Sequence, residues 1–463
     1  MSSSAQNVAW MPVIAKSDGP VYLAIARAIG DDIYSGVLRP GQRLPPQRAL
    51  AEALGVDFTT VSRAYNAASK DGLVEGRVGQ GTYVKAGDAP QRNAPSRLRD
   101  HSVDMSMNMP PRFDESALQR KLFDVLDGAA AQDWLMKYQS PGGHAEDRLQ
   151  AMQWLSEKQQ LENTSDLVLC NGVQGAAWSI LSQITVPGDT ICCEELCYPG
   201  VLTLAKHMKL NVCPVAMDDQ GVIPEALDAA CAEQNPKAFY VTPTLHNPTT
   251  VTMSEARRQS LSKVIVRRDL LTIEDDAYGV VSASAPAPLA YFAPAKTWYL
   301  ASLSKCLAPA LRACLVLPPV GTSPEGFKRS IRASGNLISP ISASLATHWM
   351  RSKLADKVTD AIRKETRKRQ DAFAKWLPDT PVKDDAFHVW MPLPSNLSAM
   401  QLVLSLRGVD LGVVPAQVFA PGDAPNAVRI AIGSSESLTS FEEAVKALAD
   451  VIANPHDTAW MVV

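Results

Sequence analysis

The sequence lacks several features that would point to a specialised class of protein. Its 45 lysines and arginines nearly balance 48 aspartates and glutamates, so a net charge of −3 gives the whole chain no attraction to nucleic acid. Any DNA binding must come from a local group of basic residues. No apolar run approaches the roughly 18 residues of a membrane span, and the start has no basic region followed by an apolar stretch. We therefore expect a cytoplasmic protein.

The chain also lacks the cysteine spacing of a metal site. Its eight cysteines are scattered, and only Cys192, Cys193 and Cys197 lie close together. A zinc site needs a spaced pair with a second pair or histidines, whereas the run from Ile191 to Cys193 is typical of a buried strand end. We expect structural thiols and no metal.

The chain is long enough for more than one hydrophobic core. It has 463 residues, 46% of them hydrophobic, while a single core stops growing at roughly 250–300 residues. Residues 86–102 read AGDAPQRNAPSRLRDHS, with two prolines, little apolar content and no periodicity, which is typical of a linker. We predict an N-terminal domain over residues 1–86, a linker over 87–103 and a large domain over 104–463.

The N-terminal segment combines three helical patterns with a glycine-rich hairpin. Apolar periodicity predicts helices over 21–35, over 46–54 with Gly55 as C-cap, and from Thr59 or Thr60 to Lys70. Two short strands around glycines follow in residues 72–84. Helix, tight glycine turn, second helix and hairpin in this order are typical of a winged helix-turn-helix, although three amphipathic helices alone would also suit a plain bundle.

A winged helix-turn-helix would contact DNA through the start of its third helix and the tip of its wing. Polar or basic residues stand there, and glycine at the tip allows close approach to the backbone. The stretches GVLRPGQRLPPQRALAEALGV, TTVSRAY and GLVEGRVGQGTYV resemble the GntR-type winged helix, over about residues 19–84. Where relatives usually carry a serine-arginine pair, this chain has Asp57-Phe58. The candidates for contact with double-stranded DNA are Arg43, Arg48, Thr59, Thr60, Ser62, Arg63, Gln80 and Gly81.

After the linker, apolar strands alternate with longer amphipathic segments. This rhythm predicts an α/β domain with a mostly parallel sheet. Expected strands cover residues 167–170, 190–193, 211–215, 238–241, 271–274, 297–300 and 313–317.

A lysine follows one of these strands on a turn of small residues, in YLASLSKCLAPALR. A lone lysine among serines is usually solvated, but Lys305 there can form a Schiff base with an aldehyde, while hydroxyls and Arg312 can clamp a phosphate. Carboxylates at 274–276 and Asn247 end other strands, where ligands of parallel sheets bind. Residues 171–175 precede a helix whose backbone N–H groups and dipole suit a phosphate.

From about Asp104 onward the chain resembles fold type I pyridoxal-phosphate enzymes, the aspartate aminotransferase class. The resemblance implies a smaller C-terminal α+β subdomain and pyridoxal 5′-phosphate as cofactor, with Lys305 carrying the internal aldimine. Asp275, rather than Asp276, would pair with the pyridine nitrogen, because Asp-x-Ala-Tyr is the family pattern. The remaining implied roles are Tyr278 and Asn247 bonding the ring oxygen, Tyr198 stacking on the ring, Ser302, Ser304, Arg312 and the backbone of Val173 and Gln174 holding the phosphate, Tyr138 reaching a neighbouring subunit's phosphate, and Arg429 binding a substrate carboxylate.

Some of these assignments stay open at the level of sequence. Tyr138 and Tyr198 could be core aromatics instead of cofactor contacts. The chain also departs from the family at Thr250, where a glycine is usual and where bulk beside the ring could change which amine fits. Residues 145–148 read Ala-Glu-Asp-Arg where relatives often have a leucine-arginine pair.

A GntR-type reader fused to a fold type I domain is the architecture of the MocR family, and the whole chain resembles it. The resemblance implies a homodimeric transcription regulator that senses an amino compound through formation of an external aldimine, on an operator with two half-sites. One alternative is a working aminotransferase with a DNA-binding appendage. Another keeps DNA binding and leaves the large domain as a dimerising relic.

Overall fold

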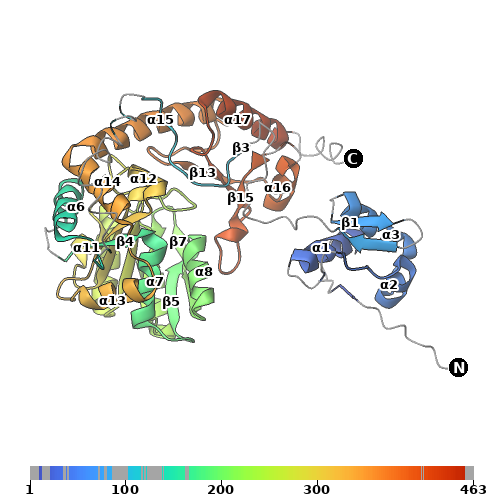
Figure 1. The fold of residues 1–463 in the computed structure, drawn as a ribbon, viewed down its shortest axis with the longest axis horizontal. Helices are drawn as coiled ribbons and strands as arrows, with labels where there is room; N and C mark the ends of the chain where they lie inside the picture. The colour runs from blue at the N-terminus through green and yellow to red at the C-terminus, as the bar shows by residue number, and fades with distance from the viewer. Residues whose placement is uncertain are drawn as a thin grey trace. The chain divides into compact units, whose positions relative to one another are not determined.

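The computed structural model describes residues 10–12, 21–34, 38, 41–70, 73–77, 81–85, 103–115, 118, 121, 138, 140–161, 166–407, 409 and 411–453. The chain divides into two compact units, Met1–Arg99 and Asp100–Val463 (Figure 1). Among the described residues, no helix has the length and apolar character needed to span a bilayer.

The first unit is the expected helix-turn-helix with a hairpin. Gly55 ends the second helix, and its N–H donates to the carbonyls of Ala51 and Glu52. Its φ of 65° lies in the left-handed region, which glycine adopts without strain. The Asp57 carboxylate accepts a hydrogen bond from the Thr59 N–H at 2.8 Å, which lets the third helix begin one residue before its predicted start. The elements are α1 (Val21–Tyr34), α2 (Gln47–Leu54), α3 (Phe58–Lys70) and the antiparallel β1 (Val74–Arg77) and β2 (Gly81–Val84).

One small core holds these elements together. Ile25, Leu50, Val61 and Val84 come from four different elements and are at most 1% exposed. Tyr65 is also buried, and its hydroxyl donates to the Pro45 carbonyl at 2.8 Å, which ties α3 to the segment before α2. The two helices of the reader are therefore fixed relative to each other.

The second unit is built on a seven-stranded sheet in the order β4-β12-β11-β10-β9-β5-β6. Only β12 runs against its neighbours, so the sheet is mostly parallel, as predicted. Central strands are buried on both faces, because helices cover both sides, and they appear in the sequence as continuous apolar runs. Their bounds are β4 (Val168–Asn171), β5 (Thr190–Glu194), β6 (Asn211–Val215), β9 (Ala238–Val241), β10 (Thr272–Asp276), β11 (Thr297–Ser302) and β12 (Ala313–Leu317).

Helices follow most strands and pack on the two faces of the sheet (Figure 1). The ones that matter for the site are α7, which starts directly after β4, and α12, which starts directly after β11. The larger helices of this part are α6 (Ala145–Lys158), α7 (Gly172–Ile184), α8 (Pro199–His207), α9 (Pro224–Gln234), α10 (Glu255–Arg267), α13 (Glu325–Ala333) and α14 (Pro340–Arg351), and the short ones are α11 (Leu289–Phe292) and α12 (Leu303–Cys306).

A smaller subdomain with its own core completes this unit. It contains the antiparallel sheet β13 (His388–Pro392), β16 (Ala427–Ala431) and β15 (Val414–Pro415), and the helices α15 (Leu354–Trp376), α16 (Ala399–Arg407) and α17 (Leu438–Ala453).

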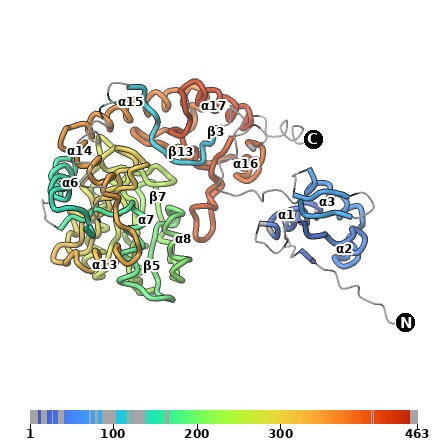
Figure 2. Tube along the Cα trace, in the orientation of Figure 1, coloured from blue at the N-terminus to red at the C-terminus, as the bar shows by residue number. Residues whose placement is uncertain are grey.

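The chain that follows the linker packs against this C-terminal subdomain, as the trace of Figure 2 shows. β3 (Val103–Asp104) pairs in parallel with β14 (Leu411–Gly412), and the Ala431 N–H donates to the Met105 carbonyl at 2.8 Å. A Cβ on Gly433 would lie 1.8 Å from the Met109 carbonyl oxygen, so glycine is required for the two segments to pass. Segments more than 300 residues apart in the sequence therefore form one wall.

The cysteines are free thiols, and six of the eight are buried. Burial raises the pKa of Cys170 and of Cys306 to about 12, so both stay protonated at neutral pH. Among the described residues, no group of three His, Cys, Asp or Glu side chains is arranged to hold a metal ion.

Candidate functional site

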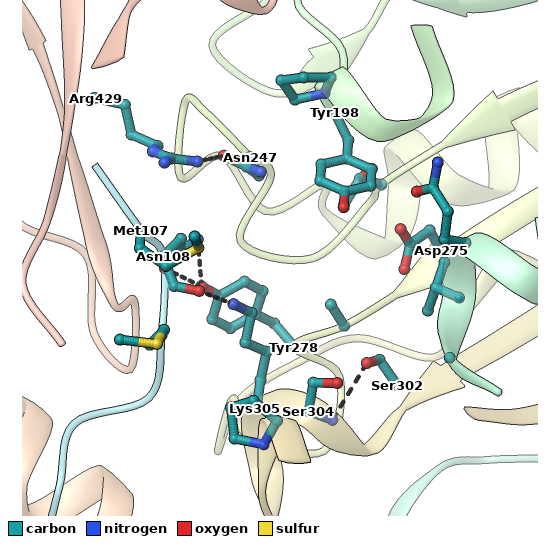
Figure 3. A pocket seen from close by; sticks show the side chains of 18 of the residues that line it. Met107, Asn108, Tyr198, Asn247, Asp275, Tyr278, Ser302, Ser304, Lys305 and Arg429 are labelled. Carbon is teal, nitrogen blue, oxygen red and sulfur yellow. Dashed lines mark hydrogen bonds between the residues drawn. The ribbon is translucent and has the colours of Figure 1, made fainter. Parts of the chain in front are cut away.

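A cavity of about 500 Å³ lies at the carboxyl ends of the parallel strands, and residues from β10, from β11 and from the loop after β9 line it (Figure 3). Ligands of open α/β sheets bind at this edge. It collects eleven of the residues that the sequence singled out, namely Val173, Gln174, Tyr198, Asn247, Asp275, Tyr278, Ser302, Ser304, Lys305, Arg312 and Arg429.

Lys305 stands on α12, one turn beyond the end of β11. Its ammonium nitrogen contacts the Asn108 carbonyl oxygen. Burial, aided by the charge of Arg429 and opposed by Asp275, lowers the pKa of the amine to about 7. Near neutral pH a large fraction of the amine is therefore uncharged, and the uncharged amine is the nucleophilic form.

Asp275 is a buried carboxylate with an incomplete set of partners. One oxygen accepts from the Tyr240 hydroxyl at 2.5 Å, and the other has no hydrogen-bond partner among the described residues. Burial raises the pKa of Asp275 to about 7, and the charges of Asp276 and Glu194 act in the same direction. Such a carboxylate is suited to a cationic hydrogen-bond donor that enters the cavity.

The neighbouring acid on the same strand points elsewhere. Successive side chains of a strand face opposite sides of the sheet, and Asp276 accepts from the Tyr299 hydroxyl at 2.7 Å without lining the cavity. This geometry favours Asp275 over Asp276 as the residue that meets a ligand.

One end of the cavity suits a phosphate. The first turn of α7 presents backbone N–H groups at Val173 and Gln174. Gly172 has φ +69°, and the nearest guanidinium atom of Arg312 lies 3.3 Å from the place a Cβ would occupy. Arg312 is exposed, and no described residue forms a hydrogen bond or ion pair with its guanidinium. Ser302 caps α12 by accepting from the Ser304 N–H at 3.3 Å.

The opposite end is dominated by Arg429 on β16, which is only 6% exposed. It donates to Asn247 Oδ1 at 2.9 Å and to the Ser106 carbonyl, while its Nε has no partner among the described residues (Figure 3). Burial lowers its pKa to about 10, so the guanidinium remains charged at neutral pH. Its guanidinium carbon lies 5.1 Å from the ring centre of Phe419.

Tyr278 belongs to a polar cluster that the sequence did not reveal. Its hydroxyl lies 3.0 Å from Asn108 Nδ2 and 3.3 Å from His388 Nδ1. His388 is fully buried on β13, and burial together with the charge of Arg429 holds its pKa well below the usual value. The neutral imidazole also contacts the His246 carbonyl at 3.1 Å.

Several further cavity residues were missed by the sequence analysis. Thr242 directly follows β9 and could have been found by the strand-end argument that found Asn247. Pro309 lies within the stretch around Lys305 but was not singled out. The others come from segments with no motif and meet only through folding: Ser106, Met107, Asn108, Met109, Val414, Val418 and Phe419.

Two residues that the sequence analysis discussed lie outside the cavity of the single chain. Tyr138 is fully exposed, which excludes a core role, and it does not line the cavity, so a contact with a neighbouring subunit stays a prediction. Thr250 is buried, donates its hydroxyl to the Thr249 carbonyl at 2.6 Å and does not line the cavity either. Its bulk therefore does not reach the space where an amine would bind.

In the N-terminal unit, the basic candidates separate into two groups. Arg43 lies beside Gly81 at the start of β2, and the Arg48 guanidinium lies 5.7 Å from the ring centre of the exposed Phe58. Both line a hollow of about 300 Å³ between the start of α2, α3 and β2. Arg63 instead stacks on the Tyr22 ring of α1 at 4.1 Å.

The polar candidates at the start of α3 are partly engaged. Asp57 accepts from both the N–H and the hydroxyl of Thr59, and the two bonds lower its pKa. Thr60 and Ser62 are partly exposed, and Gln80 lies outside the described residues.

Comparison with known proteins agrees with this two-part construction. The model of bacterial regulatory proteins of the gntR family matches residues 21–84, and the model of aminotransferase class I and II matches residues 101–448. The chain belongs to the aminotransferase class I and II family. With the gntR match, it is a transcriptional regulator of the MocR kind, with an aminotransferase-like domain.

Relatives share the whole architecture. The HTH-type transcriptional regulator YdeF of Bacillus subtilis is 28% identical over 450 residues, covering 95% of this chain and 96% of its own. The vitamin B6 salvage pathway transcriptional repressor PtsJ of Salmonella typhimurium is 25% identical over 400 residues, covering 84% and 90%.

Solved structures share the fold of the larger domain. The α-aminoadipate aminotransferase LysN of Thermus thermophilus has a TM-score of 0.67 and 19% identity, covering 77% of this chain and 93% of its own. The multiple substrate aminotransferase of Thermococcus profundus has a TM-score of 0.68 and 21% identity, covering 78% and 93%. The aminotransferase family is pyridoxal-phosphate dependent, and regulators of the gntR family bind DNA.

Proposed function

We propose that this regulator holds pyridoxal 5′-phosphate at Lys305, senses an amino compound there, and reads double-stranded DNA through residues 21–84 as a homodimer. One observation carries the proposal. The same cavity holds an amine with a lowered pKa, a buried carboxylate and a helix N-terminus beside Arg312. One oxygen of that carboxylate and the Arg312 guanidinium have no partner among the described residues.

These residues fit the cofactor in charge and in polarity. The phosphate would bind at the start of α7 with Arg312, Ser302 and Ser304, where N–H groups, hydroxyls and a guanidinium converge. The free oxygen of Asp275 would accept from a protonated ring nitrogen, which would stabilise the charged form of this carboxylate.

Pyridoxal phosphate supplies an aldehyde that condenses reversibly with primary amines, so an amino compound can compete with Lys305 for it. Lys305 is suited to this exchange, because an amine with a pKa of about 7 is released partly uncharged. Arg429 would bind the carboxylate of the incoming compound through its free Nε and a neighbouring N–H.

Borohydride reduction followed by peptide mapping tests the cofactor site. A pyridoxyl adduct should appear on Lys305 in the wild type and be absent from Lys305→Ala. Lys296→Ala is a matched control, since Lys296 lies outside the cavity and pairs with Asp269. A wild type reconstituted with the cofactor that carries no adduct at Lys305 would refute the proposal.

Coupling to DNA requires that the amino compound bind more tightly to one arrangement of the DNA-binding domains than to the other. Operator affinity should therefore change on addition of the compound in the wild type and stay constant in Lys305→Ala. If the readers are paired, the operator holds two half-sites separated by whole turns of roughly 10–10.5 base pairs. The complete exposure of Tyr138 agrees with its serving a partner subunit.

A second candidate function is an active aminotransferase that carries a DNA-binding appendage. The buried Arg429 favours it, because the chain retains a cation where an enzyme of this family would hold its substrate carboxylate. Measurement of turnover with an amino donor and a 2-oxo acid decides between the two. A half-reaction that stalls or takes hours supports a sensor of amino compounds, whereas steady turnover at rates of roughly 1 s⁻¹ or more supports an active aminotransferase.

The relative PtsJ points to one further molecule that this regulator could sense. That protein is a repressor of vitamin B6 salvage, so the cofactor itself could be what this regulator senses. Operator binding compared with and without pyridoxal phosphate, in the absence of any amino compound, separates this signal from an amino effector.

A further inference from the structure

One wall of the cavity is not used by the groups proposed to hold the cofactor. It lies near Arg429 and combines the segment after β3 with the segment that runs from β15 through η3 (Ala416–Val418) to Phe419. Its apolar side chains are Met107, Met109, Val414, Val418 and Phe419.

Charged groups are scarce along the same wall. Among the described residues that line the cavity, the cations are Lys305, Arg312 and Arg429, and the carboxylate is Asp275. When the cofactor is bound, Asp275 and Arg312 are engaged with it, and Lys305 is released partly uncharged when the effector's amine replaces it, so Arg429 is the permanent cation left for an effector. No carboxylate of these residues is left for a second ammonium group.

The apolar side chains are also partly open in the free site. Met107 is 57% exposed, Met109 37% and Val418 45%. Exposed apolar groups that gather at a cavity mark a place where an apolar ligand gains by burial, and methionine adapts to ligands of different shape.

From this wall we infer the class of effector, resting on the proposed function: an amino acid with a single carboxylate and an uncharged, apolar side chain. Its carboxylate binds Arg429, and its side chain lies against Met107, Val418 and their neighbours. A second carboxylate would lose its water without gaining a cation, and a second ammonium would find no acid, so both are selected against.

The affinity should therefore rise with the apolar length of the side chain. Each methylene buried contributes a gain of roughly fourfold in the dissociation constant. Alanine, 2-aminobutyrate, norvaline and norleucine form a series that differs by one methylene at each step, and glutamate and lysine have side chains of comparable length that end in a charge.

The test titrates the full-length protein, loaded with pyridoxal phosphate, by absorbance and by calorimetry. We expect affinity to rise along the series, with norleucine at least tenfold tighter than glutamate, lysine or cadaverine. Equal or tighter binding of a charged compound would overturn the inference, whether this chain or a partner subunit supplies the opposite charge. An affinity that does not depend on side-chain length would overturn it as well.

A pair of variants gives a second readout. Met107→Lys adds a cation to the apolar wall, so it should weaken norleucine and strengthen glutamate by tenfold or more. Met400→Lys is the matched control, since Met400 is 51% exposed on α16 and does not line the cavity, and its selectivity should equal that of the wild type. An unchanged preference in Met107→Lys would contradict the proposed position of the side chain.

Failure of the inference differs from failure of the proposed function. If borohydride leaves no adduct at Lys305, the cofactor site itself is wrong. If the adduct forms and charged amino compounds bind best, only the effector class is wrong. A loaded protein that binds no amino compound at all overturns both the effector class and amino-compound sensing.

Discussion

The substitution Asp275→Asn separates two effects of the buried carboxyl: the stability that the cofactor-free protein loses by burying it, and its contribution to cofactor binding. The wild-type carboxyl has its pKa raised from 3.8 to about 7, chiefly by burial. The folded state thus keeps a proton that the unfolded chain has lost between these two pH values. Stability falls as pH rises through that window, and above pH 7 the cost reaches about 4 kcal/mol at roughly 1.4 kcal/mol per pKa unit.

Asparagine removes this cost while keeping the local contact. Its amide oxygen can still accept from the Tyr240 hydroxyl, and its volume is that of aspartate. In cofactor-free protein, the free energy of unfolding of the variant relative to the wild type should therefore grow by roughly 3 kcal/mol between pH 5 and pH 8. That gain corresponds to several degrees in the unfolding temperature.

Thermal unfolding of both cofactor-free proteins at pH 5 and pH 8 measures this difference. Asp228→Asn is the contrasting control, because Arg268 and Arg267 lower the pKa of the partly exposed Asp228 to about 2, so its removal cannot stabilise the protein at pH 8. On addition of pyridoxal phosphate the order should reverse, with the wild type gaining more stability than Asp275→Asn. The reasoning fails if the asparagine variant is less stable than the wild type at pH 8 without cofactor, or if the difference is independent of pH.

Three further predictions use the same structural features. Tyr240→Phe removes the donor to Asp275, so it should raise the pKa of that carboxyl and weaken pyridoxal phosphate by roughly tenfold or more in absorbance titrations; unchanged affinity would contradict it. The rate at which cofactor-free protein captures pyridoxal phosphate should rise from pH 6 to pH 8 and then level off, because the pKa of Lys305 is about 7; a stopped-flow rate that climbs steadily to pH 10 would show an ordinary lysine. Arg43→Ala should weaken DNA binding and lower the slope of log binding constant against log salt concentration by about 0.9, because one DNA phosphate is no longer neutralised. Arg63→Ala should change affinity and slope little, since its guanidinium stacks on Tyr22. Fluorescence anisotropy across salt concentrations measures both, and equal effects of the two substitutions would disprove this assignment.

The strands of the central sheet could be predicted because burial on both faces leaves a plain signal. All seven were located within two residues of their ends, and four of them, such as β9 and β10, are buried at every position. Their order and the reversed direction of β12 were not predicted, since both depend on pairing between distant segments. The two-residue strands β3 and β14 were missed for the same reason, as each exists only through the other.

In the N-terminal unit, local hydrogen bonds and backbone conformation decide most of the helix boundaries. Gly55 ends α2 where its φ of 65° demands glycine, and this could be read from the sequence. Asp57 was noted only as the absence of a serine-arginine pair, while the structure shows it as the cap of α3, bonded to Thr59. The orientation of Arg63 toward Tyr22 could not be foreseen, because it depends on how α1 packs against α3.

The two ends of the cavity differ in how much sequence can say about them. A site for an aldehyde, a cationic ring and a phosphate needs an amine, an anion and N–H donors, and few residue types supply these, so Lys305 and Asp275 stand out near the ends of strands. An apolar wall needs only carbon and sulfur atoms at the correct distance, and Met107 or Val418 is chemically indistinguishable from a core residue until folding brings the two segments together. His388 is hidden in the same way, since a buried neutral imidazole in a strand has no local mark of its contact with Tyr278. The polar residues of this cavity could therefore be predicted from the sequence, whereas its apolar wall depends on contacts between segments about 300 residues apart.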